Sequence, residues 1–65
     1  MPKYSQKLKA QRGNRSMTAV AAAVGVSASA LSMYECGKRV PRDEVKIALS
    51  NYYNVSVGEL FFDQK

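Results

Sequence analysis

The strongest restriction on the fold comes from four residues in the first half of the chain, Val24-Gly25-Val26-Ser27. Gly25 suits a tight turn because glycine adopts a positive φ without strain, and Ser27 is a good N-cap for the helix that follows. A turn of three or four residues that contains glycine sets its two helices at roughly 90–120° to each other. We therefore predict two short helices, over residues 17–23 and 28–35, joined by a sharp bend.

The remainder of the chain is also predicted to be helical, because alternating β-branched residues are scarce and helix-capping residues are frequent. We predict three further helices, over residues 3–12, 42–53 and from 57 to 61 or 62. The last of these is expected to begin at a capping box, in which the side chains of Ser56, before the helix, and Glu59, in its first turn, each accept a hydrogen bond from the N–H group of the other. The expected fold class is therefore all-α, a compact five-helix domain over residues 1–65.

Residues typical of helix ends and of buried faces support this division. Left-handed exits are expected after three of the helices, at Gly13, Gly37 and Asn54. Hydrophobic staples, which fix the entry of a helix, are expected for Val26 with Leu31 and for Val55 with Leu60. Residues at helical spacing predict the buried faces: Tyr4, Leu8 and, as a third position, Gln11; Val20, Ala21 and Val24; Leu31 and Tyr34; and Val45, Leu49 and Tyr52.

Composition excludes several functions. The chain has no histidine and a single cysteine, Cys36, so it cannot build a Cys/His zinc site, close an internal disulfide or use histidine as an acid or base. No nucleophile–base pair and no phosphate-cradling glycine loop stands out, so we expect no enzyme activity, metal, cofactor or small-molecule substrate. The nearly uncharged run 16–34 lacks the bulky apolar residues of a membrane span, and no secretory signal opens the chain. We therefore expect a cytoplasmic protein.

Charge is distributed unevenly along the chain, whose net charge is +5. Residues 1–34 carry five cations and no acid, residues 35–42 carry three cations and one acid, and residues 43–65 carry four acids and two cations. A basic front and an acidic back favour a polyanionic partner. The alternative is a charged surface that is merely solvated.

The helix over residues 28–35 has the surface chemistry of an element that enters the major groove of DNA. Its outward residues are small and neutral, and its first acid is Glu35 at its end, so phosphate groups would not repel it. The preceding helix can then lie across the sugar–phosphate backbone. Backbone N–H groups near Met17 and Ala28 are candidate phosphate donors, because helix N-termini attract anions.

With these features, the chain resembles the Cro/C1-type helix-turn-helix family, the lambda-repressor-like or XRE domains of phage and bacterial regulators. The matching positions keep the family's spacing without insertion and are Ser16, Val20-Ala21, Val24-Gly25-Val26-Ser27, Leu31-Ser32, Tyr34-Glu35, Gly37-Lys38-Arg39, Pro41, Leu49, Val55-Ser56-Val57 and Glu59-Leu60-Phe61-Phe62. The resemblance implies a five-helix DNA-binding domain of the nucleoid, usually dimeric, that regulates transcription, with repression as the expected output.

The resemblance also implies which residues touch DNA. Carried over by position, the family's base-contacting places fall on Met17, Ala28, Ser29, Ser32 and Met33. Phosphate contacts fall on Ser16, Ser27, Cys36, Lys38, Arg39 and Arg42. Outside this motif, the same residues would be ordinary helix-surface side chains, solvated loop charges and a neutral thiol.

Three departures from the family pattern affect this assignment. Arg15 stands where a buried leucine is usual, which removes the hydrophobic staple of the helix that follows it. The family's arginine that pairs with the glutamate of the recognition helix aligns with Ala10, which leaves Lys9 and Arg12 as candidate partners of Glu35. The base-contacting positions also lack the long amides and arginines whose bidentate pairs each contribute roughly 1–3 kcal/mol of discrimination. We therefore expect modest direct readout, with phosphate contacts and DNA shape supplying the rest.

The aromatic residues of the C-terminal half exceed what so small a core can bury. We expect the surplus, Tyr53 and Val57 or Phe62, to form a two-fold homodimer surface on the acidic half of the chain. Two protomers would then bind a pseudo-palindromic site on double-stranded DNA. The alternative function is a protein-interaction module with a vestigial DNA surface, which the short side chains of residues 28–35 leave open.

Overall fold

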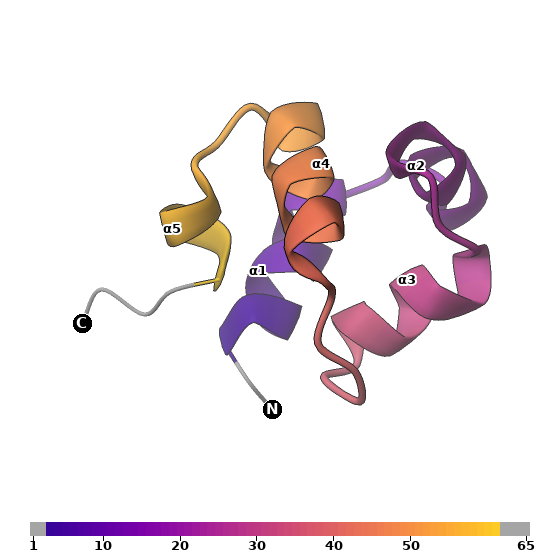
Figure 1. The fold of residues 1–65 in the computed structure, drawn as a ribbon. Helices are drawn as coiled ribbons and strands as arrows, with labels where there is room; N and C mark the ends of the chain where they lie inside the picture. Colours follow the sequence, from indigo (N-terminus) through magenta and orange to yellow (C-terminus); the bar gives the residue numbers. More distant parts are fainter. Residues whose placement is uncertain (1–2, 62–65) are drawn as a thin grey trace.

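The computed structural model describes residues 3–61, and its helices are α1 (Lys3–Arg12), α2 (Met17–Val24), α3 (Ala28–Glu35), α4 (Asp43–Tyr53) and α5 (Val57–Phe61). No strand occurs in this range, and the predicted all-α class with five helices is confirmed. Helix α4 runs through the centre of Figure 1, with α1 behind it, α5 on one side and α2 and α3 on the other. Helix α2 is one residue longer than predicted, and α4 begins one residue later.

Helices α2 and α3 begin where a serine side chain satisfies one of the first N–H groups. The hydroxyl of Ser16 accepts a hydrogen bond from the Ala19 N–H at 3.2 Å, and that of Ser27 accepts one from the Ala30 N–H at 3.0 Å. Val26, which precedes the second of these caps, is half-buried against the core, as a staple requires. Both predicted N-caps are therefore confirmed.

Helices α4 and α5 begin in different ways. The predicted capping box of α5 is formed, because the Glu59 N–H donates to Ser56 Oγ at 3.1 Å and the Ser56 N–H donates to Glu59 Oε1 at 3.0 Å. Helix α4 has Arg42 at its N-cap, which makes no capping bond with its side chain. Two acids, Asp43 and Glu44, occupy its first turn, where the helix dipole favours negative charge.

The predicted bend between α2 and α3 is also confirmed. Gly25 has a φ of 83°, and the Val26 N–H donates to the Ala21 carbonyl at 2.9 Å, which closes the end of α2. The two helices are bent by 104° relative to each other. Asn54 ends α4 in the same left-handed conformation, with a φ of 61°. The sequence signals at both ends of α2 therefore fix the direction in which α3 leaves it.

Two of the residues predicted to be buried are in fact exposed, Gln11 and Tyr52. In α4 the buried stripe continues from Leu49 to Tyr53, one turn later, so Tyr52 is turned outward and is 40% exposed. In α1, Arg12 takes the inward position predicted for Gln11, four residues after the buried leucine of that helix. The buried core consists of Leu8, Val20, Ala21, Val24, Leu31, Tyr34, Leu49, Tyr53 and Leu60, and the predicted positions Tyr4 and Val45 are partly buried against it. Tyr53 is the member that is predicted from the sequence to lie at the surface.

Candidate nucleic-acid interface

One face of α3 is turned away from the core and carries four of the five residues for which base contacts are predicted. Ala28 and Ser29 are exposed, Ser32 is half-buried, and Met33 is 43% exposed. They share a face because they lie at positions i, i+1, i+4 and i+5 of one helix, whereas Leu31 points into the core. This face carries hydroxyl, methyl and thioether groups and no charge.

The fifth residue, Met17, is the first residue of α2 and is half-buried against the core. The hydrogen bonds of α2 begin with the Val20 N–H, which donates to the Ser16 carbonyl at 3.0 Å, while the Ser16 hydroxyl takes the Ala19 N–H. The N–H groups of Met17 and Thr18 therefore point out of the N-terminal end of α2. Such groups bind anions, so Met17 contributes to this end of α2 through its backbone as well as its side chain.

The N-terminal end of α3 is built in the same way. The Leu31 N–H donates to the Ser27 carbonyl at 3.0 Å, and the Ser27 hydroxyl takes the Ala30 N–H. The N–H groups of Ala28 and Ser29 are thus free to point out of this helix end. Each of the two helices therefore begins with an exposed serine cap, Ser27 directly after the bend and Ser16 at the opposite end of α2.

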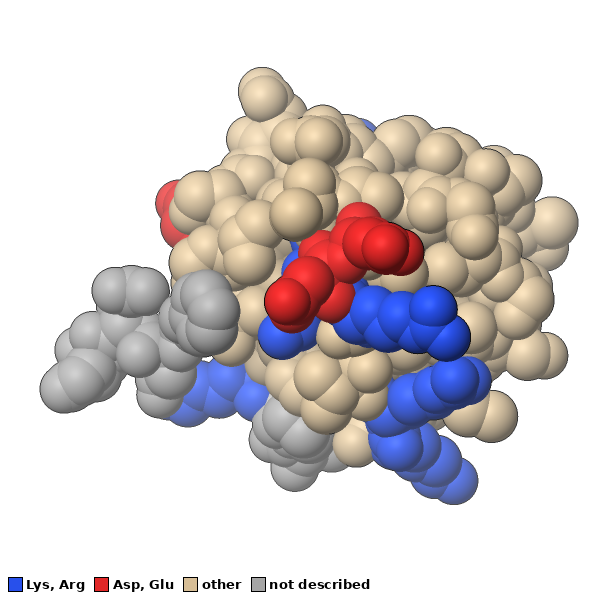
Figure 2. Space-filling model, viewed as in Figure 1, with Lys and Arg blue, Asp and Glu red and all other residues tan. Residues whose placement is uncertain are grey.

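The chain between α3 and α4 forms a basic loop over residues 36–42, in which Pro41 is buried and the cations are exposed. Lys38, Arg39 and Arg42 are exposed, and Figure 2 shows cationic side chains gathered around this loop, beside the acidic side chains that start α4. The hydroxyl of Tyr4 donates to the Arg39 carbonyl at 2.9 Å and so ties the loop to α1. The three cations predicted to contact phosphate are therefore held close to the C-terminal end of α3.

Glu35, the only acid of α3, is removed from the exposed surface by burial and by pairing. Its side chain is 1% exposed, and Arg12 Nε donates to its two carboxylate oxygens at 2.8 and 3.1 Å. This hydrogen bonding raises the pKa of Arg12 above its ordinary value, although burial of the guanidinium opposes the shift. Of the two candidate partners, Arg12 is the one that pairs with Glu35, and Lys9 is exposed.

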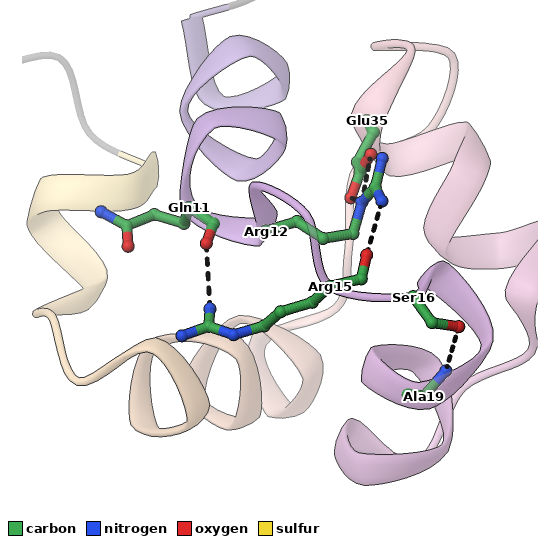
Figure 3. A network of polar contacts seen from close by, with 6 residues as sticks. All are labelled: Gln11, Arg12, Arg15, Ser16, Ala19 and Glu35. Carbon is green, nitrogen blue, oxygen red and sulfur yellow. Dashed lines mark hydrogen bonds and ion pairs between the residues drawn. The ribbon is translucent and has the colours of Figure 1, made fainter.

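Arg12 and Arg15 hold the connection between α1 and α2. Arg12 Nη1 donates to the Arg15 carbonyl at 2.9 Å, and Arg15 Nη1 donates to the Gln11 carbonyl at 3.0 Å. Figure 3 shows the two guanidinium groups pointing apart, that of Arg12 toward α3 and that of Arg15 back toward α1. The Arg15 guanidinium also lies over the rings of Tyr52 and Tyr53, 5.7 and 5.5 Å from their centroids. A polar network therefore occupies the place where the family pattern has a buried leucine.

Sequence reasoning did not identify the roles of Tyr4 and Arg15, and it left the partner of Glu35 open. The sequence contained a signal for Tyr4 and for Arg12, the partner of Glu35. A tyrosine on an inward helix face needs a partner for its hydroxyl, and Tyr4 finds one in the basic loop. Arg12 follows Leu8 by four residues, so it lies on the buried stripe of α1, where a cation requires an acid. No local signal predicts that Arg15 packs over two tyrosines of α4.

The predicted dimer surface is only partly available. Tyr53 is 7% exposed and belongs to the core, so its assignment to this surface is wrong, and the reason is the shift of the buried stripe of α4 by one residue. Phe62 lies outside the described residues. Val57 is half-buried and lines a hollow of about 370 Å³ together with Asp43, Lys46 and Ile47. Ile47 is 53% exposed, so this hollow has an apolar wall open to solvent.

Other chemistry is sparse in the described part of the chain. No three His, Cys, Asp or Glu side chains of residues 3–61 are grouped so that they could hold a metal ion. Cys36 is an exposed free thiol at the end of α3. Over the same residues, no individual helix has the length and apolarity needed to cross a membrane, and the bent pair α2–α3 meets that criterion only as a pair.

Comparison with known proteins agrees with this geometry. A family model described as helix-turn-helix matches residues 7–60, a range that contains the bend, both serine caps and the basic loop. Searches of curated proteins and of solved structures returned no match. The matched range covers most of the chain and includes every residue for which a DNA contact is predicted. The chain therefore belongs to the Cro/C1-type helix-turn-helix family of DNA-binding regulators.

Proposed function

We propose that this protein is a homodimeric transcriptional repressor that binds a pseudo-palindromic site on double-stranded DNA. The observation that carries the proposal is the 104° bend between α2 and α3, which leaves an uncharged face of α3 beside a cationic loop. A bend of this size allows α2 to cross the DNA backbone while α3 lies in the major groove. Helix α3 is then the recognition helix.

Phosphate groups are bound in this proposal by two kinds of donor. The cations of the basic loop neutralise phosphates and release counterions, which makes the affinity depend on salt. The N-terminal ends of α2 and α3 offer N–H and hydroxyl groups, which orient the protein on the backbone. The proposed phosphate contacts are Ser16, Ser27, Cys36, Lys38, Arg39 and Arg42.

Base readout falls on side chains that discriminate modestly. Ala28 and Met33 offer apolar contact, for example to thymine methyl groups, whereas Ser29 and Ser32 offer single hydrogen bonds that several bases accept. Met17 is half-buried and can present only part of its side chain to a base. We therefore expect DNA shape to supply part of the specificity.

The hollow between α4 and α5 is assigned in this proposal to a second copy of the chain. Its wall includes exposed Ile47 and half-buried Val57, and its rim carries one acid, Asp43, and one cation, Lys46. Asp43 Oδ1 and Lys46 Nζ are paired at 3.9 Å within one copy. In a two-fold contact the acid of each copy can also face the cation of the other, so the rim is self-complementary. Analytical ultracentrifugation at roughly tens of micromolar protein should give a dimer for the natural chain and a monomer for Ile47→Asp, because the variant buries a charge in the contact. A natural chain that stays monomeric at this concentration would refute the dimer.

Of the possible effects on transcription, repression requires only that the dimer occupies its DNA site. A dimer that occupies two half-sites about one DNA turn apart, roughly 34–36 Å, covers the major groove that other proteins read. Any signal would then act through DNA occupancy, dimerisation or a partner protein.

The proposal is tested by selecting bound sequences from a random DNA pool and measuring affinity for the selected site against salt concentration. If a dimer neutralises about 6–10 phosphates, its affinity should fall 10³–10⁵-fold between 50 and 200 mM salt. Amide-shift mapping with the same DNA should perturb α2, α3 and the basic loop. A flat salt response, or shifts confined to α4 and α5, would contradict the proposal.

A charge variant sharpens this test. Arg39→Ala should weaken binding to all sequences and lower the slope of log affinity against log salt by about 1 for each phosphate that the variant no longer neutralises. Lys9→Met is the matched control, because it removes one positive charge from an exposed position of α1 that the proposal assigns neither to phosphate nor to the dimer contact. The control should leave the salt slope unchanged.

A further inference from the structure

We propose that Arg12 is a positioning residue for DNA binding, because its guanidinium ties the end of the recognition helix to the residue that precedes the N-cap of α2. The inference rests on the proposed function, in which the N-terminal end of α2 binds a phosphate and α3 lies in the major groove. Arg12 would then set where that phosphate site lies relative to the bases that α3 meets.

The contacts that carry this inference come from one side chain. Arg12 Nε donates to both carboxylate oxygens of Glu35, the last residue of α3, at 2.8 and 3.1 Å. Arg12 Nη1 donates to the Arg15 carbonyl at 2.9 Å. The planar guanidinium presents its donors in a fixed arrangement, so the two acceptors are held at a fixed distance from each other. Figure 3 shows Arg12 between them, with its head group at Glu35 and one nitrogen aimed at the Arg15 carbonyl.

The position of the Arg15 carbonyl determines where the N-terminal end of α2 lies. One peptide bond separates it from Ser16, whose carbonyl and hydroxyl accept the first hydrogen bonds of α2. A shift at this carbonyl therefore moves the N–H groups of Met17 and Thr18, which are the proposed phosphate donors. Since Arg15 stands in place of an apolar staple residue, this polar link fixes the entry of α2.

Stability alone does not account for the arrangement. Buried ion pairs can often be replaced by apolar pairs of similar volume without loss of stability. An apolar pair between α1 and α3 would fill the same space but could not donate to the Arg15 carbonyl. The property that only Arg12 supplies is thus the link from α3 to the start of α2, and a variant that separates packing from this link can test it.

The decisive variant is Arg12→Met combined with Glu35→Leu, which removes one charge of each sign and leaves the net charge unchanged. We expect this double variant to melt cooperatively and to bind the selected DNA at least about 10-fold more weakly than the natural chain, the effect of removing one charge-assisted hydrogen bond. We also expect an unchanged salt slope, because backbone N–H groups release no counterions when they bind phosphate. Affinity equal to that of the natural chain would overturn the inference. A reduced salt slope would also overturn it, because Arg12 would then contact a phosphate directly.

Arg12→Lys is a second variant that keeps the charge beside Glu35 and decides the question if the double variant does not fold. Lysine lacks the planar fork that fixes both acceptors, so we expect a loss of affinity that is smaller than tenfold and clearly above experimental error. Affinity equal to that of the natural chain would overturn the inference here too. If the natural chain itself binds no selected DNA, the proposed function fails, whereas binding that is equally strong in every variant refutes only the role of Arg12.

Discussion

Helices α2 and α3 have the same length and the same kind of cap, yet their starts are anchored to the rest of the protein by different forces. Before α3, Val26 packs against the core as an apolar staple. Before α2, the Arg15 carbonyl accepts a hydrogen bond from Arg12, and the Arg15 guanidinium donates one to the Gln11 carbonyl. The same guanidinium lies over the rings of Tyr52 and Tyr53. Apolar anchoring is local and tolerates change, whereas the polar anchoring of α2 depends on groups from α1, α3 and α4.

The largest expected difference between the two anchors lies in the free energy of unfolding. Arg12→Ala leaves Glu35, which is 1% exposed, as an uncompensated buried charge, and such a loss costs about 3–5 kcal/mol. Val26→Ala shortens a half-buried staple residue and should cost about 1 kcal/mol. Urea denaturation followed by circular dichroism measures the loss for Val26→Ala, and the folded fraction of Arg12→Ala without urea gives a lower bound on its loss.

A domain this small has little stability to spare, so Arg12→Ala is expected to be largely unfolded at 25 °C. The control is the double variant Arg12→Met with Glu35→Leu, which has no unpaired buried charge and should unfold cooperatively. Equal losses for Arg12→Ala and Val26→Ala would show that the two anchors do not differ in the way described.

The caps themselves should not differ. Ser16→Ala and Ser27→Ala each remove one hydrogen bond to a helix N–H, at 3.2 and 3.0 Å, and each should lower the free energy of unfolding by about 1 kcal/mol. Ser16→Asp and Ser27→Asp should restore most of the loss, because aspartate caps equally well. If Ser16→Ala costs several times more than Ser27→Ala, the polar network would extend into the cap and the local view of capping would be wrong.

The same contrast explains what the sequence could predict. The start of α3 was predictable because Val26, Ser27 and Leu31 lie within six residues, and each acts through a neighbour along the chain. The capping box of Ser56 and Glu59 was predictable for the same reason. The outward face of α3 followed from helical spacing alone, whereas the contacts of its residues with DNA stay a prediction.

The anchoring of α2 could not be predicted in this way, because its partners are far apart in sequence. Arg12 and Glu35 are 23 positions apart. The bond from Tyr4 to Arg39, which ties the basic loop to α1, was missed for the same reason, because its partners are 35 positions apart. Sequence spacing left two candidates for the partner of Glu35, and the choice depends on how α1 rotates against α3. The rotation of α4 about its own axis was likewise not predicted from the sequence, and for this reason Tyr53 is buried and Tyr52 is exposed, the reverse of the prediction.

The smallest expected effect concerns the far edge of this polar network, at Tyr53. Burial of its hydroxyl raises the pKa of Tyr53, with a further contribution from the negative charge of Glu35. Within residues 3–61, the Tyr53 hydroxyl is buried and has no hydrogen-bond partner. Tyr53→Phe should therefore change the free energy of unfolding at pH 7 by less than about 1 kcal/mol.

A difference should appear only in alkali. Below pH about 10, the pKa of an unfolded tyrosine, the hydroxyl is protonated in both states, so its titration does not change the free energy of unfolding. As the pH rises further, the unfolded chain releases this proton before the folded chain does, so the natural chain loses stability that Tyr53→Phe retains. Urea midpoints measured from pH 7 to 11 should fall more steeply for the natural chain, since the other tyrosines and the lysines are common to both proteins. Parallel curves would mean that Tyr53 reaches solvent readily, and the network that anchors α2 would then end at Arg15.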